Sequence, residues 1–126
     1  MLLDTHVLIW MVDDHPRLGP KARSAIVASS APRFSAASTW EMAIKAAQGR
    51  MRTPRGFDDY LRSSGLTALP VSVVHTLAVE DYPQLNGHDP FDRLLVAQAG
   101  VEQLTLLTAD ARLLAAGLPF TLDARL

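Results

Sequence analysis

Short, continuously apolar runs alternate with segments of helical periodicity along the 126-residue chain, and this alternation most strongly constrains its fold. The clearest run is LTLLT at 104–108, and the chain opens on a similar run, MLL. Strands that are apolar at every position are typical of a parallel sheet covered by helices on both faces. The sequence therefore predicts an α/β fold, a three-layer α/β/α sandwich around a central parallel sheet of four to five strands.

The pattern also places the individual elements. Strands are expected in MLLDTH, RFSAAS, LTALPVS and LTLLT, with a fifth in PFTLD. Between them, apolar residues recur every three or four positions, which is typical of amphipathic helices. Of these segments DPFDRLLVAQAGVEQ is the most apolar, so we expect it to form the most buried helix. Helices are predicted at 7–12, 19–29, 38–49, 57–65, about 73–80, 89–103 and 109–117.

Length and composition limit the classes of protein that fit. A chain of 126 residues is expected to form one domain, spanning 1–126. Its formal net charge of −1 provides no overall basic field, so a nucleic-acid partner would need a local patch or a metal. The absence of cysteine excludes disulfides, thiolate zinc sites and a cysteine nucleophile. No signal peptide or membrane span is recognisable, so we expect a cytoplasmic protein.

Four acidic residues fall where a parallel sheet of this kind binds ligands, beyond the carboxyl ends of its strands. Asp4 ends the first strand and Asp110 follows the fourth. Asp92 and Glu41 are expected in the first turns of two helices, Glu41 in the capping-box pattern Ser38-x-x-Glu41. Acids are common at helix starts, so each residue also has a purely structural interpretation as a cap. Capping does not explain why four mutually repelling charges would be gathered at one edge.

A divalent cation would account for such a gathering. Mg²⁺ and Mn²⁺ prefer carboxylate oxygens, and Mg²⁺ keeps several waters while taking one or two protein ligands directly. An ion held in this way polarises a phosphodiester and lowers the pKa of a bound water that attacks phosphorus. No nucleophilic side chain is required, which suits a chain without cysteine. The four histidines are scattered and form no convincing zinc site.

Four segments, in the same order and spacing, resemble the motifs of PIN-domain ribonucleases, specifically the VapC-type toxins of bacterial toxin–antitoxin systems. The segments are MLLDTHVLIW, STWEMAIK, HDPFDRLLVAQA and LLTADARL, and the resemblance extends from Met1 to about residue 122. It implies a PIN-like fold and a Mg²⁺- or Mn²⁺-dependent endoribonuclease that hydrolyses RNA phosphodiester bonds. It also implies a homodimer and a small VapB-like antitoxin whose C-terminal segment lies over the acidic pocket.

The resemblance assigns catalytic and metal-binding roles residue by residue. It carries them over to Asp4, Glu41, Asp92 and Asp110, one from each segment, although Asp110 retains its complete interpretation as a helix cap. Arg93 either pairs with Asp92 or contacts the scissile phosphate, and Asp89 is mainly a helix cap behind the metal site. The remaining supporting positions carry small hydroxyl side chains, Thr5, Ser38 and Thr108.

Other features admit two interpretations. Basic residues are grouped once in the chain, at the end of the predicted helix that carries Glu41 and in the loop after it. They either hold RNA phosphates or an acidic antitoxin segment, or form an ordinary solvated face. The larger aromatic residues are most simply interpreted as core residues, with Trp40 also a candidate for a subunit contact. The basic residues are Lys45, Arg50, Arg52 and Arg55, and the aromatic residues are Trp10, Trp40, Phe91 and Phe120.

Two alternative functions belong to other classes of protein. A phosphoacceptor signalling domain also gathers acids and Mg²⁺ at the strand ends of such a sheet. It needs a lysine after a late strand, and this chain has none there. A catalytically inactive PIN-like binding module would only engage its partner. The presence of all four acids speaks against it, since a module without catalysis has no reason to keep a repulsive cluster. The identity of the RNA and the number of metal ions do not follow from the sequence.

Overall fold

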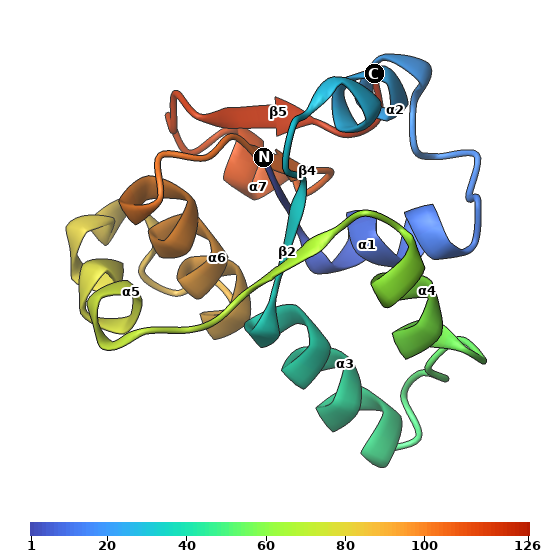
Figure 1. Ribbon diagram of the computed structural model, residues 1–126. Coiled ribbons are helices and arrows are strands. Elements are labelled where there is room, and N and C mark those ends of the chain that lie inside the picture. Colours follow the sequence, from blue (N-terminus) through green and yellow to red (C-terminus); the bar gives the residue numbers. More distant parts are fainter.

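The computed structural model describes residues 1–126 and places a five-stranded sheet between two layers of helices (Figure 1). All neighbouring strands are parallel, in the order β3-β2-β1-β4-β5. The prediction of a three-layer α/β/α sandwich is confirmed, including the fifth strand. The strands are β1 (Leu2–Leu3), β2 (Arg33–Ser35), β3 (Thr67–Leu69), β4 (Leu106–Thr108) and β5 (Thr121–Asp123).

Seven α-helices and two short 3₁₀ helices connect these strands. No helix is long and apolar enough to span a lipid bilayer. The α-helices are α1 (Thr5–Val12), α2 (Pro20–Ala28), α3 (Ala36–Ala47), α4 (Phe57–Ser63), α5 (Val73–Leu77), α6 (Pro90–Val101) and α7 (Ala111–Leu114), and the 3₁₀ helices are η1 (Ala78–Asp81) and η2 (Pro83–Leu85).

The two residues of β1 belong to different hydrophobic cores. Leu2 packs in one core with Leu95 of α6, whereas Leu3 packs in another with Val7 of α1 and Ala22 of α2. In Figure 1, α5 and α6 lie to the left of the sheet and α1, α2 and α4 to its right. Successive side chains of a strand point to opposite faces, so a sheet covered on both faces needs apolar residues at every position.

The prediction that α6 is the most buried helix is confirmed. Five consecutive side chains, Leu95–Ala99, are buried. The helix begins as expected, because Asp89 Oδ1 accepts hydrogen bonds from the backbone N–H of Phe91 at 2.9 Å and of Asp92 at 3.3 Å. Pro90 occupies the first helical position, where no backbone donor is needed. The capping residue thus leaves Asp92 in the first turn, at the carboxyl edge of the sheet.

The predicted start of α3 at Ser38 is wrong. The helix begins at Ala36, and its cap is Ser35, the last residue of β2, whose Oγ accepts a hydrogen bond from Ala37 N at 2.9 Å. Strand and helix are therefore joined without a loop, and the expected capping box at Ser38 does not form. Glu41 lies in the second turn of α3 instead of the first, further from the end of the strand.

The direction in which the strands are added reverses at β1, with β2 and β3 on one side and β4 and β5 on the other. In open α/β sheets, ligands bind outside the carboxyl ends of the strands at such a reversal. The pairing of Leu3 with Leu107 in the β1–β4 ladder brings the residues that follow them, Asp4 and Thr108, side by side. The topology thus places Asp4 and the turn after β4 at the expected binding position.

Candidate functional site

Asp4 is held between the ends of β1 and β4. Its Oδ1 accepts a hydrogen bond from Val7 N at 2.9 Å and so caps α1, and its Oδ2 accepts a hydrogen bond from the Thr108 hydroxyl. The residue is only 5% exposed, and this burial raises the pKa of the Asp4 carboxyl above its usual range. The cap that the sequence allowed is present, and the carboxyl group is fixed from both sides.

Asp110 is also a helix cap, at the start of α7. Its Oδ1 accepts hydrogen bonds from Arg112 N at 2.8 Å and Leu113 N at 3.0 Å. Its own backbone N–H donates to Thr108 Oγ1 at 3.0 Å, so Thr108 links the two strand-end acids. The capping bonds occupy Oδ1 alone, and Oδ2 makes no hydrogen bond within the protein. Capping and ligand binding are therefore compatible at Asp110.

Glu41 projects from α3 and is only 6% exposed. The Nζ atom of Lys45, one turn further along the helix, lies 3.0 Å from Glu41 Oε2. A cation therefore already neutralises this carboxylate. The sequence contains the signal for this pair, because residues at i and i+4 face each other on a helix. Lys45 therefore belongs to this ion pair and is not a free cation of the basic loop that follows α3.

Asp92 has neither a cation nor a hydrogen-bond donor for its side chain. Its pKa is raised to about 7, first by burial and then by the charges of four other acids. These are Asp89, Asp110, Asp4 and Glu41, in decreasing order of effect. The Asp92 carboxylate also accepts no hydrogen bond from the backbone N–H of the cap, Asp89. The ionised form of Asp92 is therefore destabilised both by burial and by the negative charges of the neighbouring acids.

We call Asp4, Glu41, Asp92 and Asp110 the acidic cluster. No three histidine, aspartate or glutamate side chains are arranged as a ready set of direct metal ligands. The donors nevertheless suit a hard divalent cation, because all four are carboxylates, the charges of the other three raise the pKa of Asp92, and Lys45 is the only basic side chain in a salt bridge with one of them. Such a cation, with several waters and one or two direct protein ligands, fits this open arrangement better than a closed cage does.

Three supporting residues lie around the cluster in different ways. The Thr5 hydroxyl donates to Ser38 Oγ at 3.0 Å, which joins the starts of α1 and α3. Both side chains are buried. Asp89 is exposed and serves as the cap of α6, while its charge contributes to the raised pKa of Asp92. All three therefore hold or influence the elements that bear the acidic cluster.

The expected ion pair between Arg93 and Asp92 does not form. Arg93 Nη2 instead donates to Asn86 Oδ1 at 3.1 Å, and no salt bridge joins Arg93 to an acid. Adjacent residues of a helix point in different directions, so sequence proximity does not bring their side chains together. Asp92 therefore has no counter-charge in its own segment.

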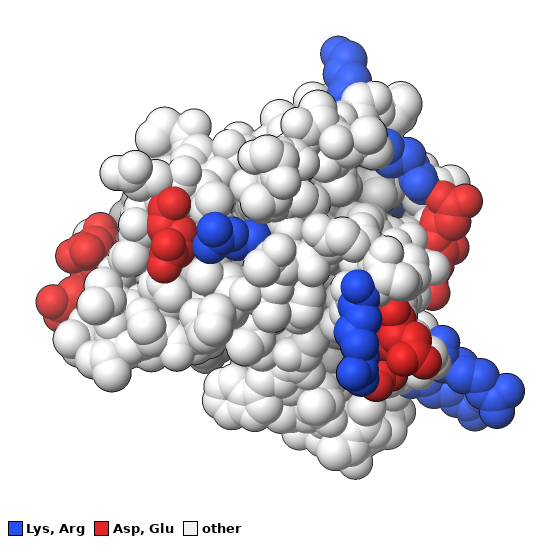
Figure 2. Space-filling view, viewed as in Figure 1, with Lys and Arg blue, Asp and Glu red and all other residues white.

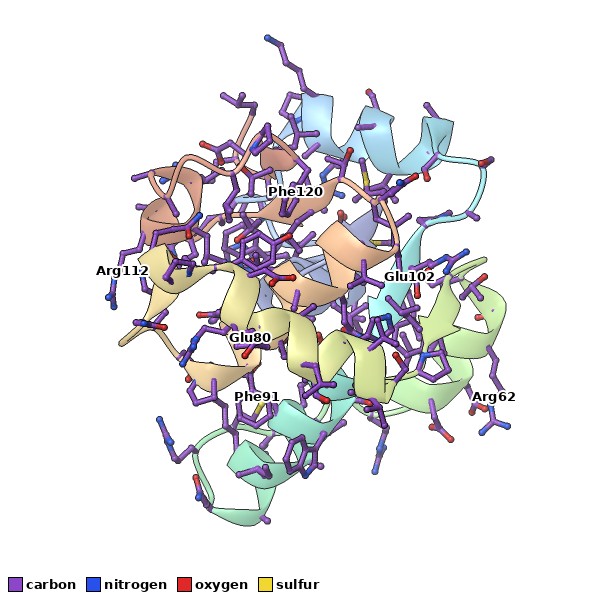
Figure 3. The ribbon with its side chains drawn as sticks, turned by 90° about the vertical axis from the view of Figure 1, so that its left-hand side faces the viewer. Arg62, Glu80, Phe91, Glu102, Arg112 and Phe120 are labelled. Carbon is purple, nitrogen blue, oxygen red and sulfur yellow. The ribbon has the colours of Figure 1, made fainter.

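The prediction that Trp40 is a core residue is wrong, because its side chain is 60% exposed. Its ring contacts Phe91 edge to face, with the ring centroids 5.2 Å apart. Phe91 lies beside α3 in Figure 3, next to Asp92 in the chain. The aromatic pair therefore links α3 to the first turn of α6, immediately outside the acidic cluster.

A buried hydrogen-bond network, which the sequence analysis missed, also joins α3 and α6. Gln98 is fully buried, and its Oε1 accepts a hydrogen bond from Ser35 Oγ, the cap of α3. Its Nε2 lies 3.3 Å from Pro70 O and 3.3 Å from His75 Nδ1. A glutamine within the apolar run LLVAQA was the available signal. The network fixes the two helices that carry Glu41 and Asp92.

The fold and the site together define the class: a parallel α/β protein with an acidic cluster at the switch point of its sheet. A model of the PIN domain family matches residues 1–117, and the chain belongs to this family. PIN domains are generally nucleases and typically use divalent metal ions. No curated protein matches the sequence.

Two solved structures share this fold at low sequence identity. A chain of a toxin–antitoxin complex from Klebsiella pneumoniae is similar with a TM-score of 0.68 and 18% identity, covering 98% of this chain and 96% of that one. A chain of VapBC2 from Rickettsia felis, crystallised with a DNA fragment of its promoter, has a TM-score of 0.70 and 15% identity, with 96% of each chain covered. The PIN-like fold that the sequence motifs implied is therefore confirmed.

Proposed function

We propose that this protein is a metal-dependent endoribonuclease, the toxin of a toxin–antitoxin pair. The observation that carries the proposal is the state of Asp92, whose pKa is raised to about 7 in part by the charges of acids from three other segments. Keeping such a carboxylate half-buried without a partner lowers stability, so it calls for a cation that the protein alone does not supply. The chain belongs to a family whose members are generally nucleases, and a bound cation would serve the hydrolysis of a phosphodiester.

In the proposed site, the acidic cluster holds one or two Mg²⁺ or Mn²⁺ ions, partly through water. The ion, when bound, polarises the phosphodiester and makes water a stronger nucleophile. Thr108 keeps Asp4 oriented through its hydroxyl, and Asp110 offers its free Oδ2. Gln98 and the Thr5–Ser38 pair hold the helices that carry the other two acids. The residues thus bind and orient, and none of them needs to attack the phosphate.

The alternative functions account for less of the structure. A phosphoacceptor domain requires a lysine near the acids after a late strand, and both segments after β4 and β5 lack one. Lys45, the only lysine at the cluster, comes from the helix after β2. An inactive binding module gains nothing from a carboxylate whose pKa is raised by its neighbours. We therefore propose hydrolysis of RNA as the activity.

The proposed partners are an antitoxin of the VapB type and a second copy of the chain, in the cytoplasm. Uncovered apolar side chains on α5, which lies at the front of Figure 3, support a protein contact on that face. Val73, Val74 and Leu77 are 73%, 61% and 66% exposed. Sedimentation of the purified protein, alone and with the product of the adjacent reading frame, tests both partners.

The decisive test is incubation of the purified protein with total RNA, in Mg²⁺, in Mn²⁺ and in EDTA, followed by mapping of the new ends. We expect defined cuts that require the metal and disappear in Asp92→Asn. Arg62→Gln serves as a matched control, because Arg62 pairs with Asp58 on α4, away from the cluster. Cleavage that persists in EDTA or in Asp92→Asn would show that the cluster is not the catalytic centre.

A further inference from the structure

A cavity of about 580 Å³ opens beside the acidic cluster, and of its lining residues only Asp110 belongs to that cluster. Four separate segments contribute to it: α1, the loop between α1 and α2, the turn after β4, and the C-terminus. Its volume is in the range of small-molecule sites. The lining residues are His6, Trp10, Pro16, Arg17, Ala109, Asp110 and Arg125.

The cavity shares residues with the surroundings of the catalytic acids. Asp110 lines the cavity and also raises the pKa of Asp92 by its charge. His6 lines it as well, and this residue lies two positions after Asp4 in the chain. A chain whose scissile phosphate lies at the acidic cluster can therefore continue directly into the cavity.

Arg17 supplies an unused positive charge to this cavity. Its guanidinium makes no hydrogen bond or ion pair within the protein. The loop that carries it is nevertheless held in place, because Arg17 N donates to His15 Nδ1 at 3.1 Å. The His15 ring in turn stacks on Trp10, with centroids 5.7 Å apart and planes 17° from parallel. The free cation is thus presented from an ordered loop next to an aromatic wall.

Arg125 presents a second guanidinium in a fixed orientation. Its Nε and Nη2 donate to the two carboxylate oxygens of Asp123 at 2.9 and 2.7 Å, which leaves the donors of Nη1 free. The C-terminal segment that carries Arg125 is fixed against the start of α2, as Figure 1 shows for the chain end marked C. Gly19 permits this approach, since a Cβ atom there would lie 2.2 Å from Leu126 O.

We propose that this cavity binds the nucleotide of the RNA substrate that adjoins the scissile phosphate. Arg17 and Nη1 of Arg125 contact its phosphate, and the base packs against Trp10 and Pro16. Arginine is well suited to phosphate oxygens, and aromatic surfaces accept any base. An acidic peptide would use the arginines but not the aromatic wall. Basic side chains lie scattered among acidic ones on the face shown in Figure 2, so a protein of net charge −1 would hold RNA through a local site.

The inference rests on the proposed ribonuclease function, but binding is measurable without cleavage. The chain has two tryptophans, so Trp40→Phe leaves Trp10 as the only indole. In this background, with EDTA present, a single-stranded RNA of about eight nucleotides is titrated against the Trp10 fluorescence, a length within the range of single-strand sites. We expect a saturable change in emission, and the same titration at several salt concentrations gives the slope of log K against log[salt].

Arg17→Gln is the test variant and Arg62→Gln the control, because both remove one exposed positive charge. The slope of log K against log[salt] is negative, and loss of one phosphate contact to a single strand reduces its magnitude by about 0.7. We expect that decrease, and weaker binding, in Arg17→Gln alone. Equal effects of both variants, or an unchanged slope in Arg17→Gln, would overturn the nucleotide site. Binding of a polyglutamate peptide in place of RNA would also overturn it.

These outcomes are separate from those of the proposed function. Binding that depends on Arg17, combined with no cleavage in Mg²⁺ or Mn²⁺, would support the cavity and reject the ribonuclease. Cleavage that requires Asp92, combined with a Trp10 fluorescence titration and a salt slope that are unchanged in Arg17→Gln, would support the ribonuclease and reject the nucleotide site. A Tm for Arg17→Gln equal to that of the parent protein establishes that the variant is folded, as expected for an exposed side chain without partners.

Discussion

The acidic cluster consists of two halves that are built differently. The strand-end acids, Asp4 and Asp110, each cap a helix and are joined through Thr108. The helix-borne acids, Glu41 and Asp92, accept no hydrogen bond from the backbone. Glu41 is neutralised by Lys45, and Asp92 is left with a raised pKa. One half is part of the framework, whereas the other only adds negative charge to it.

This difference separates folding from chemistry at the level of single residues. A strand-end acid stabilises the folded chain and also offers an oxygen to a metal, so its loss affects both properties. Asp92, the helix-borne acid without a partner, stabilises nothing that the structure contains, so its loss removes repulsion from the folded chain as well as a charge from the proposed metal site. The comparison therefore predicts equal effects of the two halves on cleavage and opposite effects on stability.

The largest expected effect is on catalysis, and it is common to both halves. Asp4→Asn and Asp92→Asn keep the side-chain shape but remove a negative charge from the proposed metal site. A bound metal contributes several kcal/mol to transition-state stabilisation, and 1.36 kcal/mol corresponds to a factor of ten in rate. We expect each variant to lose at least about 100-fold in kcat/KM for a cleaved RNA. A loss in only one of the two would show that the halves do not share a site.

The next effect is on stability, and here the halves should separate. Asp4→Ala removes the cap of α1 and leaves the buried Thr108 hydroxyl without its acceptor. A lost cap costs about 1 kcal/mol and an unsatisfied buried donor about 1–3 kcal/mol. We expect the free energy of unfolding to fall by about 2–4 kcal/mol, measured by urea denaturation. Asp110→Ala loses only a helix cap, so its free energy of unfolding should be about 1 kcal/mol below that of the parent protein.

The pH dependence of stability isolates Asp92. Its pKa of about 7 in the folded protein exceeds the value of 3.8 for a free aspartate side chain, so the folded state holds an extra proton between these values. Stability from this group is therefore fully present below about pH 4 and is lost as the pH rises to about 7. Asp92→Asn should match the parent protein at pH 4 and have a higher Tm at pH 8 without metal. An unchanged difference across this range would contradict the assigned repulsion.

Metal binding should reverse that same pH effect. A cation binds the ionised form of Asp92, so its affinity for the parent protein should increase as the pH rises through about 7, with release of a proton. At a Mn²⁺ concentration 100 times the Kd, binding to the folded state adds about 2.7 kcal/mol to stability. Calorimetric titration in buffers of different ionisation enthalpy measures the proton release. Asp92→Asn, which cannot release it, serves as the control.

The strand-end half of the site was predictable from the sequence, and the helix-borne half only in outline. Carboxyl ends of parallel strands share an edge, so the positions of Asp4 and Asp110 follow once the strands are recognised. Glu41 was misplaced because two serines, Ser35 and Ser38, are equally good caps, and only the end of β2 selects the first. The cap decides how many residues separate an acid from the strand.

Contacts between distant segments account for the other corrections. The exposure of Trp40 depends on which face of α3 meets the sheet, and its contact with Phe91 joins residues from different helices. One of the two interpretations of Arg93 pairs it with its sequence neighbour Asp92, but its guanidinium donates to Asn86, which lies before α6. Helical periodicity predicts which residues share a face, and it does not predict what the face will meet.

The smallest expected effect concerns Lys45, the one cation already present in the helix-borne half. Its ammonium lies 3.0 Å from Glu41 Oε2, where it competes with a metal for that carboxylate. A partly exposed ion pair is worth about 0.2–1 kcal/mol, so Lys45→Met should tighten Mn²⁺ binding by a factor of about 1.4 to 5. Lys21→Met, on the exposed side of α2, removes the only other lysine and should leave the Kd unchanged. Weaker binding in Lys45→Met would mean that the lysine orients Glu41 for the metal instead of competing with it. The helix-borne half would then resemble the strand-end half, with a protein group holding its acid in place.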